Sequence, residues 1–482
     1  MQRRVLWVAI LASFVAFLDG AIVNVALPAM TRDLGGGITT TQWVVDAYLL
    51  ALGSLILIAG SLSDSFGRLR ILRAGLLVFG VASLACAVAP DSTFLIVARA
   101  VQGAGAALLV PSSLALITST FSGPAQGKAI GSWTAWTGTA FLAGPLVGGL
   151  LVEFASWRLV FAINVFPIAA TLILLRGLAL PQGNEDGVPA RASRVDVPGA
   201  VLAAVGLAGT VFALIEQGRL GWGSPAVFLP FVIGVVSLAA FLWWEKRTPL
   251  PMMPLGLFRI RNFGIGNLAT TFVYAGVSLG QLLVVLFLQD VAGFTAGQAG
   301  IASLPVAVIS LLLAGVFGTL AGKYGPRLFM AVGPLVAAAG YLLMTMAAEP
   351  FNFWVQILPG QIVFAVGLSI TVAPLTAAIL GSVPQEQSGI GSAINNAVAR
   401  VAGLVAVALV GVMLGGVLDF ESFRKVMVIT ALLFAAGGVV SALGITNKPA
   451  VHSEVPAAAA ANCQDKPAPG ASAHTAQAPT VS

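Results

Sequence analysis

Long apolar runs, separated by short polar stretches, dominate the chain. Within a run the apolar positions are continuous and do not alternate with polar ones, which favours helices over the strands of a membrane barrel. Each run is close to the roughly 20 residues that a helix needs to cross a membrane. The pattern therefore predicts an all-α membrane protein with fourteen spanning helices. The runs are 5–30, 42–62, 70–90, 94–120, 128–151, 157–178, 198–216, 225–244, 263–289, 297–320, 327–347, 353–381, 388–418 and 424–445.

Two polar interruptions divide these helices into sets. The sequence PQGNEDGVPARASRVD lies in residues 179–197, and EKRTPLPMMPLGLFRIRN fills residues 245–262. Between them lie the seventh and eighth helices, so the plan is six helices, an inserted pair and six more. The predicted domains are an N-terminal six-helix bundle (1–178), linkers with the inserted pair (179–262), a C-terminal six-helix bundle (263–445) and a tail (446–482). The tail is rich in Ala, Pro and Ser, cannot bury a core, and is expected to be disordered and cytoplasmic.

Composition and charge agree with a membrane location. Hydrophobic residues make up 58% of the chain and charged residues only 9%, against about 25% charged residues in soluble domains. The basic residues concentrate in loops on the side of the N-terminus, where Arg3, Arg4, Arg68, Arg70 and Arg73 lie. The positive-inside rule then predicts a multi-pass protein with both termini in the cytoplasm, and we expect it in the plasma (inner) membrane.

Several chemistries find no support in the residues. Both histidines, His452 and His474, lie in the tail, and the cysteines Cys86 and Cys463 give no disulfide framework. The segment GPAQGKA departs from a phosphate-binding loop in its spacing and its last residue. We therefore expect no metal, no cofactor, no ATP, no nucleic-acid partner and no enzymatic activity. Uphill transport would have to use an ion gradient. The expected partners are membrane lipid, protons and a small-molecule substrate, and the sequence does not specify an oligomeric state.

A glycine-rich hinge occurs twice. GSLSDSFGRLR (60–70) joins the second and third helices, and the weaker copy GTLAGKYGPR (318–327) joins the second and third helices of the last six. The repetition predicts two related halves with a substrate site between them at mid-depth. In the first copy Gly60 and Gly67 allow a tight turn, and we predict that Asp64, Arg68 and Arg70 form a gating contact. The arginines also fix topology by themselves, but Asp64 has no part in that rule.

Six segments carry a family resemblance: LDGAIVNVALP, the hinge pattern Gly-x-x-x-Asp-x-x-Gly-Arg, RAVQGAGAA, GTAFLAGPLVGG, WRLVFAINVFP and PLPMMPLGLFR, in this order. The chain resembles the fourteen-helix drug:proton antiporters of the major facilitator superfamily. The resemblance implies a proton-coupled secondary exporter of lipophilic, often cationic small molecules such as antibiotics, working by alternating access. Alternatives are a dedicated exporter of an endogenous metabolite or lipid, and a non-transporting membrane sensor on the same fold.

Three ionisable positions are candidates for coupling or substrate binding. Asp19 lies mid-way along the first helix, where a carboxylate costs about 2.5–3.5 kcal/mol on insertion scales. We predict a proton or cationic-substrate site there, with a structural acid as the alternative. The resemblance links Arg99, with Gln102 beside it, to proton transfer; snorkelling to the membrane surface is the alternative. Asp46 stands where the family usually has a small or hydroxylated residue.

Two further groups complete the candidate sites. Gly138, Gly144, Pro145, Gly148 and Gly149 match the antiporter motif of the fifth helix and predict a bend, with ordinary close packing as the alternative. Asn395, Asn396 and Arg400 form a polar cluster in the thirteenth helix, for which hydrogen bonds between helices are favoured over substrate contact.

Overall fold

A computed structural model describes residues 2–121, 123–176, 178, 196–249, 251–384 and 387–447. The chain up to residue 447 forms one compact unit, and the part so described is helical without strands. The predicted disordered tail, from residue 448 on, lies outside the described residues, as does most of the first polar interruption. A few side chains within helices, Asp64 among them, are not described either.

The first six predicted runs coincide with helices, which we call the N half. Its elements are α1 (Gln2–Leu34), α2 (Gly37–Phe66), α3 (Arg68–Ala87), α4 (Ser92–Thr120), α5 (Gly123–Phe154), α6 (Leu159–Ala162) and α7 (Val165–Leu175). The sixth run, predicted as one helix, is broken around Asn164 into α6 and α7.

The inserted pair and the C half follow. The inserted helices are α8 (Val197–Leu220) and α9 (Pro225–Glu245), followed by the short 3₁₀ helix η1 (Leu255–Arg259). The C half comprises α10 (Arg261–Leu286), the π-helical turn η2 (Phe287–Val291), α11 (Ala296–Tyr324), α12 (Pro326–Met344), α13 (Phe353–Gln356), α14 (Leu358–Leu380), α15 (Ser388–Ala408), α16 (Val410–Leu414) and α17 (Phe420–Gly444). The thirteenth run, predicted over 388–418, corresponds to one candidate span over Gly389–Leu414. A turn at Leu409 divides this span into α15 and α16, and its end lies before the predicted residue 418 because Gly415 and Gly416 adopt positive φ after α16.

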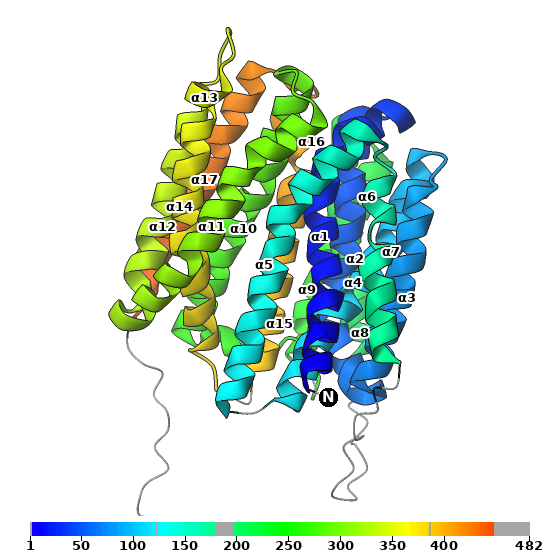
Figure 1. Cartoon of the computed structure of the whole chain (residues 1–482), viewed down its shortest axis with the longest axis vertical. Helices are drawn as coiled ribbons and strands as arrows, with labels where there is room; N and C mark the ends of the chain where they lie inside the picture. The colour runs from blue at the N-terminus through cyan, green and yellow to red at the C-terminus, as the bar shows by residue number, and fades with distance from the viewer. Residues whose placement is uncertain are drawn as a thin grey trace, which may run out of the picture. The chain divides into compact units, whose positions relative to one another are not determined.

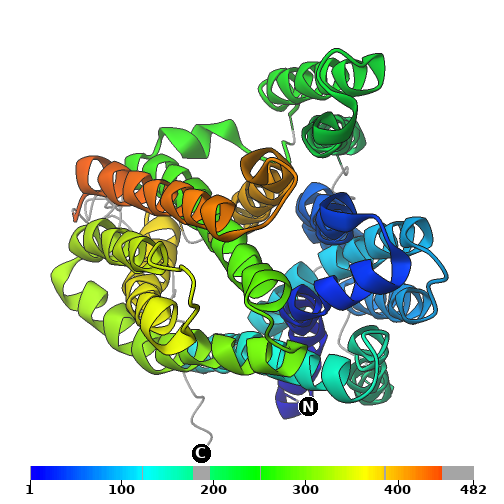
Figure 2. The same cartoon turned by 90° about the horizontal axis from the view of Figure 1, so that it is seen from above.

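Fourteen spans are accounted for in this way. Twelve helices within the described residues are long and apolar enough to cross a membrane. The 30-residue α2 and the shorter apolar segment Leu159–Leu175 occupy the two remaining predicted positions. Figures 1 and 2 show α1–α7 gathered on one side and α10–α14 with α17 on the other, and Figure 2 shows the pair α8–α9 set apart at the edge. Within this pair, α8 packs on α2 and α15, so it lies beside a seam between the halves, and α9 packs on α8.

Both copies of the glycine hinge have the same backbone form. Gly67 joins α2 to α3 with φ of 94°, and Gly325 joins α11 to α12 with φ of 85°. Only glycine adopts this region freely. The matching geometry shows that the sequence repeat corresponds to a structural repeat.

The halves approach each other at one end, which we call the distal end: the end opposite the N-terminus, where α1 finishes and α2 begins. There α5 meets α11 so closely that a Cβ atom on Gly149 would lie 2.5 Å from the carbonyl oxygen of Ala296. Nearer the other end, a Cβ atom on Gly131, Gly138 or Gly315 would meet nothing within 4 Å. The close approach of α5 and α11 is therefore a feature of the distal end.

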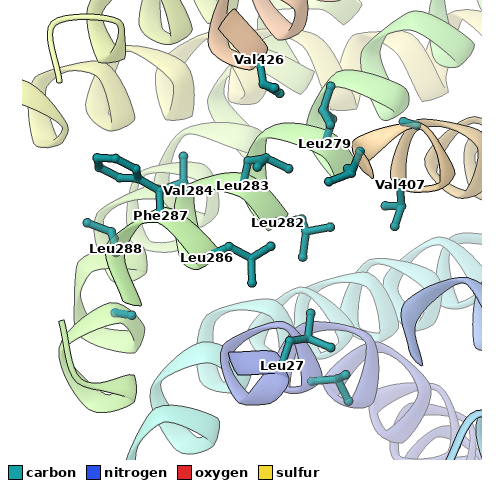
Figure 3. Packing of buried hydrophobic residues seen from close by; sticks show 14 of the residues in the cluster. Leu27, Leu279, Leu282, Leu283, Val284, Leu286, Phe287, Leu288, Val407 and Val426 are labelled. Carbon is teal, nitrogen blue, oxygen red and sulfur yellow. The ribbon is translucent and has the colours of Figure 1, made fainter. Parts of the chain in front are cut away.

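Buried apolar residues seal the distal contact. Leu27 of α1 faces Leu282 and Leu286 of α10, and Val407 of α15 lies nearby in the same buried cluster (Figure 3). Gln289 in the π-helical turn donates a hydrogen bond of 3.0 Å to the carbonyl of Val25. The two halves are thus held together here by side chains that exclude water.

Candidate proton-coupling site

A carboxylate lies at the centre of the N half. Asp19 is about 26 Å from the start of α1 at 1.5 Å per residue, which is mid-way along this helix. Its side chain is fully buried. An acid at this depth needs charged or hydrogen-bonding partners from neighbouring helices.

The principal partner is Arg99 of α4. One guanidinium nitrogen of Arg99 lies 2.6 Å from Oδ2 of Asp19, and the arginine side chain is 2% exposed. Its Nε donates to the Val44 carbonyl at 3.1 Å, and its charge lies over the Tyr48 ring, 4.2 Å from the ring centroid. Arg99 therefore does not snorkel to the membrane surface, the alternative left open by its position near the start of α4.

Amide side chains complete the site. Oδ1 of Asp19 accepts hydrogen bonds of 2.9 Å each from Gln102 Nε2 and Asn164 Nδ2. The same two amides donate to the Ser83 hydroxyl at 3.0 Å, and Gln102 Oε1 accepts from Arg99 at 2.6 Å. These contacts join α1, α3, α4 and the α6–α7 break into one network.

Sequence reasoning missed two members of this network. Asn164 is a polar residue within the apolar segment WRLVFAINVFP, and this position could have indicated a buried hydrogen-bonding role. Ser83 has no signal in the sequence, because small hydroxyl residues recur along the apolar runs.

Glycine next to the site permits the close packing that the network needs. A Cβ atom on Gly103 would collide with the carbonyl of Tyr48, and one on Gly105 would lie 2.6 Å from the backbone nitrogen of Phe79. Helices α2, α3 and α4 therefore approach with backbone close to backbone. This closeness lets Arg99 reach a main-chain carbonyl of α2.

Asp46 belongs to a different environment. It is fully buried, and neither of its carboxylate oxygens has a hydrogen-bond donor among the described residues. It lies on α2 four residues after Gln42, whose amide donates to the carbonyls of Val407 and Ala408 at 3.0 and 2.8 Å. The acid therefore lies near the seam between α2 and α15, apart from the Asp19 network.

The predicted polar cluster on α15 faces two ways. Asn395 donates to Thr270 at 2.9 Å and to Asn267 at 3.3 Å, both on α10 of the same half. Asn396 bonds to Ser392 of its own helix. Arg400 has its guanidinium carbon 5.7 Å from the ring of Phe17 on α1, so it faces the other half.

The motif of α5 is a packing surface toward two helices. Gly144 and Gly148 face Ala21 and Ile22 of α1, where Cβ atoms would come within 2.6 Å of the neighbouring side chains. Gly149 faces α11, and the carbonyl of Pro145 contacts Gly300 of α11. Gly138, by contrast, faces open space.

The gating residues are only partly described. The burial of Gly60 and the side chain of Asp64 lie outside the described part, Arg68 is half-buried and Arg70 is exposed. Their gating role stays a prediction. Within the residues that the structure describes, no cluster of three or more His, Cys, Asp or Glu side chains could hold a metal ion.

Comparison with known proteins agrees with this architecture. The sequence profile of the Major Facilitator Superfamily matches residues 9–407 and 268–473. The chain belongs to this superfamily of membrane transporters, as the six motifs predicted.

Its relatives include resistance proteins. The chain is 37% identical to the puromycin resistance protein pur8 of Streptomyces alboniger over 416 residues, covering 85% of this chain and 81% of the relative. It is 32% identical over 444 residues to the methylenomycin A resistance protein of Streptomyces coelicolor, covering 92% of each. Among solved structures, a D-xylose–proton symporter has the same fold, with a TM-score of 0.66 at 15% identity, covering 92% of this chain and 98% of that one.

Proposed function

We propose that this protein is a proton-coupled antiporter that exports lipophilic, often cationic small molecules, antibiotics among them, by alternating access. The observation that carries the proposal is the Asp19–Arg99 ion pair, buried mid-way along a membrane-spanning helix. An ionisable pair in lipid is costly and is retained where a charge must change during function. The resistance proteins named above support antibiotics as substrates.

The proton step follows from the contacts of Asp19. A proton bound by the carboxylate cancels its charge and removes the attraction to Arg99, which keeps the Val44 carbonyl and Gln102 as neutral acceptors. Because Asp19 joins α1 to α4 and to Asn164, its protonation loosens α1 within the N half. Release of the proton on the other side restores the pair.

Asp46 is proposed as a second protonatable group at the seam. A buried carboxylate without donors is stable only when protonated or when a conformational change brings it a partner. Its position beside the Gln42–Val407 contact supports a link between its charge and the separation of α2 from α15.

The moving bodies are proposed to be the two bundles, 1–178 and 263–445, with 179–262 as an appended segment. We place the protein in the plasma (inner) membrane, with both termini in the cytoplasm, so that the distal end faces outward. The distal contacts then correspond to a conformation closed on the outside, from which substrate enters from the cytoplasm. The hinge residues Asp64, Arg68 and Arg70 would hold the inner side in the opposite conformation.

The test uses inside-out membrane vesicles that contain the full chain. Puromycin uptake should depend on an acid-inside proton gradient and stop when a protonophore collapses it. The variant Asp19→Asn should lose this dependence. Uptake that is unaffected by the protonophore would contradict proton coupling, and wild-type vesicles that take up no drug would favour a non-transporting role.

A further inference from the structure

The structural repeat allows the chemistry of the two halves to be compared position by position. In the N half, Gly75 of α3 packs against Gly105 of α4, because a Cβ atom added to Gly75 would lie 3.2 Å from the carbonyl oxygen of Gly105. In the C half, Gly333 of α12 packs in the same way against Gly367 of α14: a Cβ atom added to Gly333 would lie 3.0 Å from the carbonyl oxygen of Gly367. These glycine pairs align α3 with α12 and α4 with α14.

The alignment places different side chains at the positions of the ionic network. Ser83 lies eight residues after Gly75, and Tyr341 lies eight residues after Gly333, so these two residues correspond. Arg99 and Gln361 each lie six residues before the glycine of their helix, Gly105 and Gly367, so they correspond. Gln102 and Phe364 each lie three residues before these glycines and correspond as well. At these three positions the C half therefore has two aromatic rings and one amide, where the N half has a serine, the arginine of the ion pair and one amide.

These rings form a buried aromatic cluster. The ring centroids of Tyr341 and Phe364 are 4.8 Å apart, and Phe434 of α17 lies 5.5 Å from Tyr341 and 5.8 Å from Phe364. All three side chains are buried. These three rings themselves offer no counter-ion to a charged group at the position of Gln361.

A small cavity lies beside the rings. It measures about 20 Å³ and is lined by residues that include Gln281, Ser303, Tyr341 and Gln361, and this volume admits a water-sized group. Gln361 is 3% exposed, and its Oε1 has no hydrogen-bond donor among the described residues. An unpaired buried carbonyl costs about 1–3 kcal/mol, so a donor placed in the cavity would be bound favourably.

We propose that this cavity is a substrate subsite for an uncharged hydrogen-bond donor, such as a hydroxyl or amide group, with Gln361 as the acceptor. The inference rests on the proposed export function and specifies part of its substrate recognition. Every side chain that lines the cavity is uncharged, so an ammonium group would be disfavoured there. Recognition of the neutral part of a substrate is thereby placed in the C half, and the buried ion pair in the N half.

The first experiment measures access to the cavity by cysteine labelling. In full-length protein with Cys86→Ala and Cys463→Ala, the variant Ser303→Cys is compared with Ser369→Cys. Both serines are buried, and both donate to the carbonyl four residues earlier, at 3.0 and 2.7 Å, but only Ser303 lines the cavity. Methyl methanethiosulfonate should label Ser303→Cys at least about 10-fold faster, and puromycin should slow only that reaction. Equal labelling rates would overturn the subsite whatever the transport activity.

The second experiment measures transport. The variant Gln361→Leu should raise the KM for puromycin about 3- to 10-fold, the worth of one hydrogen bond, with the maximal rate and proton dependence unchanged. Ser369→Ala is the control and should retain the wild-type KM. A structural role for Gln361 would lower thermal stability without a selective change in KM.

The outcomes separate the two proposals. Proton-driven puromycin uptake by the wild type, together with Ser303→Cys labelling that puromycin does not slow, would contradict the subsite alone and indicate a cavity for water. A wild type that takes up no puromycin would contradict the export function for this drug, and the labelling ratio would still decide whether the cavity is open.

Discussion

Neutralising Asp19 should separate the structural and the coupling roles of the buried ion pair. In the variant Asp19→Asn, Arg99 remains 2% exposed with a full charge, and its acceptors are the Val44 carbonyl and Gln102 Oε1. Removing one partner of a buried pair destabilises a protein by about 3–5 kcal/mol, because the other charge stays buried. We therefore expect a clearly lower unfolding temperature in detergent together with loss of proton-driven export.

The double variant Asp19→Asn, Arg99→Gln provides the matched control. It removes both charges and leaves amides that can bond to Gln102, Asn164 and the Val44 carbonyl. Because no uncompensated charge remains, its free energy of unfolding should be at least about 1 kcal/mol higher than that of Asp19→Asn. This difference is within the range of coupling energies between contacting residues. Export should stay uncoupled, since no carboxylate remains at the site.

Both properties are measured on the same preparation. Purified protein is unfolded thermally, and proteoliposomes with an internal pH dye report proton movement upon addition of puromycin. A double variant no more stable than the single one would refute the charge argument. Proton movement of wild-type size in Asp19→Asn would remove Asp19 from the coupling path.

Three further predictions use other parts of the chain. Asp46→Asn should leave thermal stability unchanged or higher, because neither carboxylate oxygen has a donor among the described residues, while proton-driven uptake falls; a loss of stability would reveal a missed partner. Gly149→Leu should clash with Ala296 and loosen the distal contact, measured as faster hydrogen exchange at the start of α11. The backbone N–H of Ser422 lowers the pKa of Asp419 at the start of α17. The ionised Asp419 therefore stabilises the folded protein at neutral pH, and this stabilisation is lost below about pH 4. The variant Asp419→Ala should have a lower unfolding temperature than the wild type at pH 7 and the same unfolding temperature in strong acid.

Much of the fold could be predicted because the membrane constrains it. Each predicted apolar run coincides with helix, since lipid leaves backbone groups no other partners. The breaks could not be predicted in this way. Hydropathy is insensitive to a local interruption such as the one at Asn164 or after Ala408, because the flanking residues stay apolar.

The site was predicted in pieces. Asp19 and Arg99 stand out as charges in apolar runs, but their pairing depends on how α1 and α4 are rotated, and the sequence does not specify that rotation. Ser83 became visible only through its hydrogen bonds, whereas Asn164 could have been found as a polar residue within an apolar segment. Gln361 could not be predicted, because a single uncharged polar residue in an apolar run gives no specific signal in the sequence. Only the structure shows that its side-chain carbonyl lacks a donor among the described residues.

The separation of charge and cavity between the halves bears on how exchange is coupled. Two ligands influence each other when both bias the same conformational equilibrium, even if their sites are distinct, and such coupling is typically about 1–3 kcal/mol. Here the shared element is the distal contact, where Gln42 bonds to Val407 and Gln289 to Val25 across the halves. A proton on Asp19 changes the contacts of α1, which carries Val25. A substrate in the cavity beside Gln361 contacts Gln281 of α10, and α10 continues into the turn that carries Gln289. Because α1 and the end of α10 meet at the same contact, proton and substrate need not touch in order to compete. It follows that Gln289→Leu, which breaks the contact but neither site, should reduce the protons exchanged per drug molecule while leaving drug binding intact; an unchanged ratio would show that coupling does not pass through the distal end.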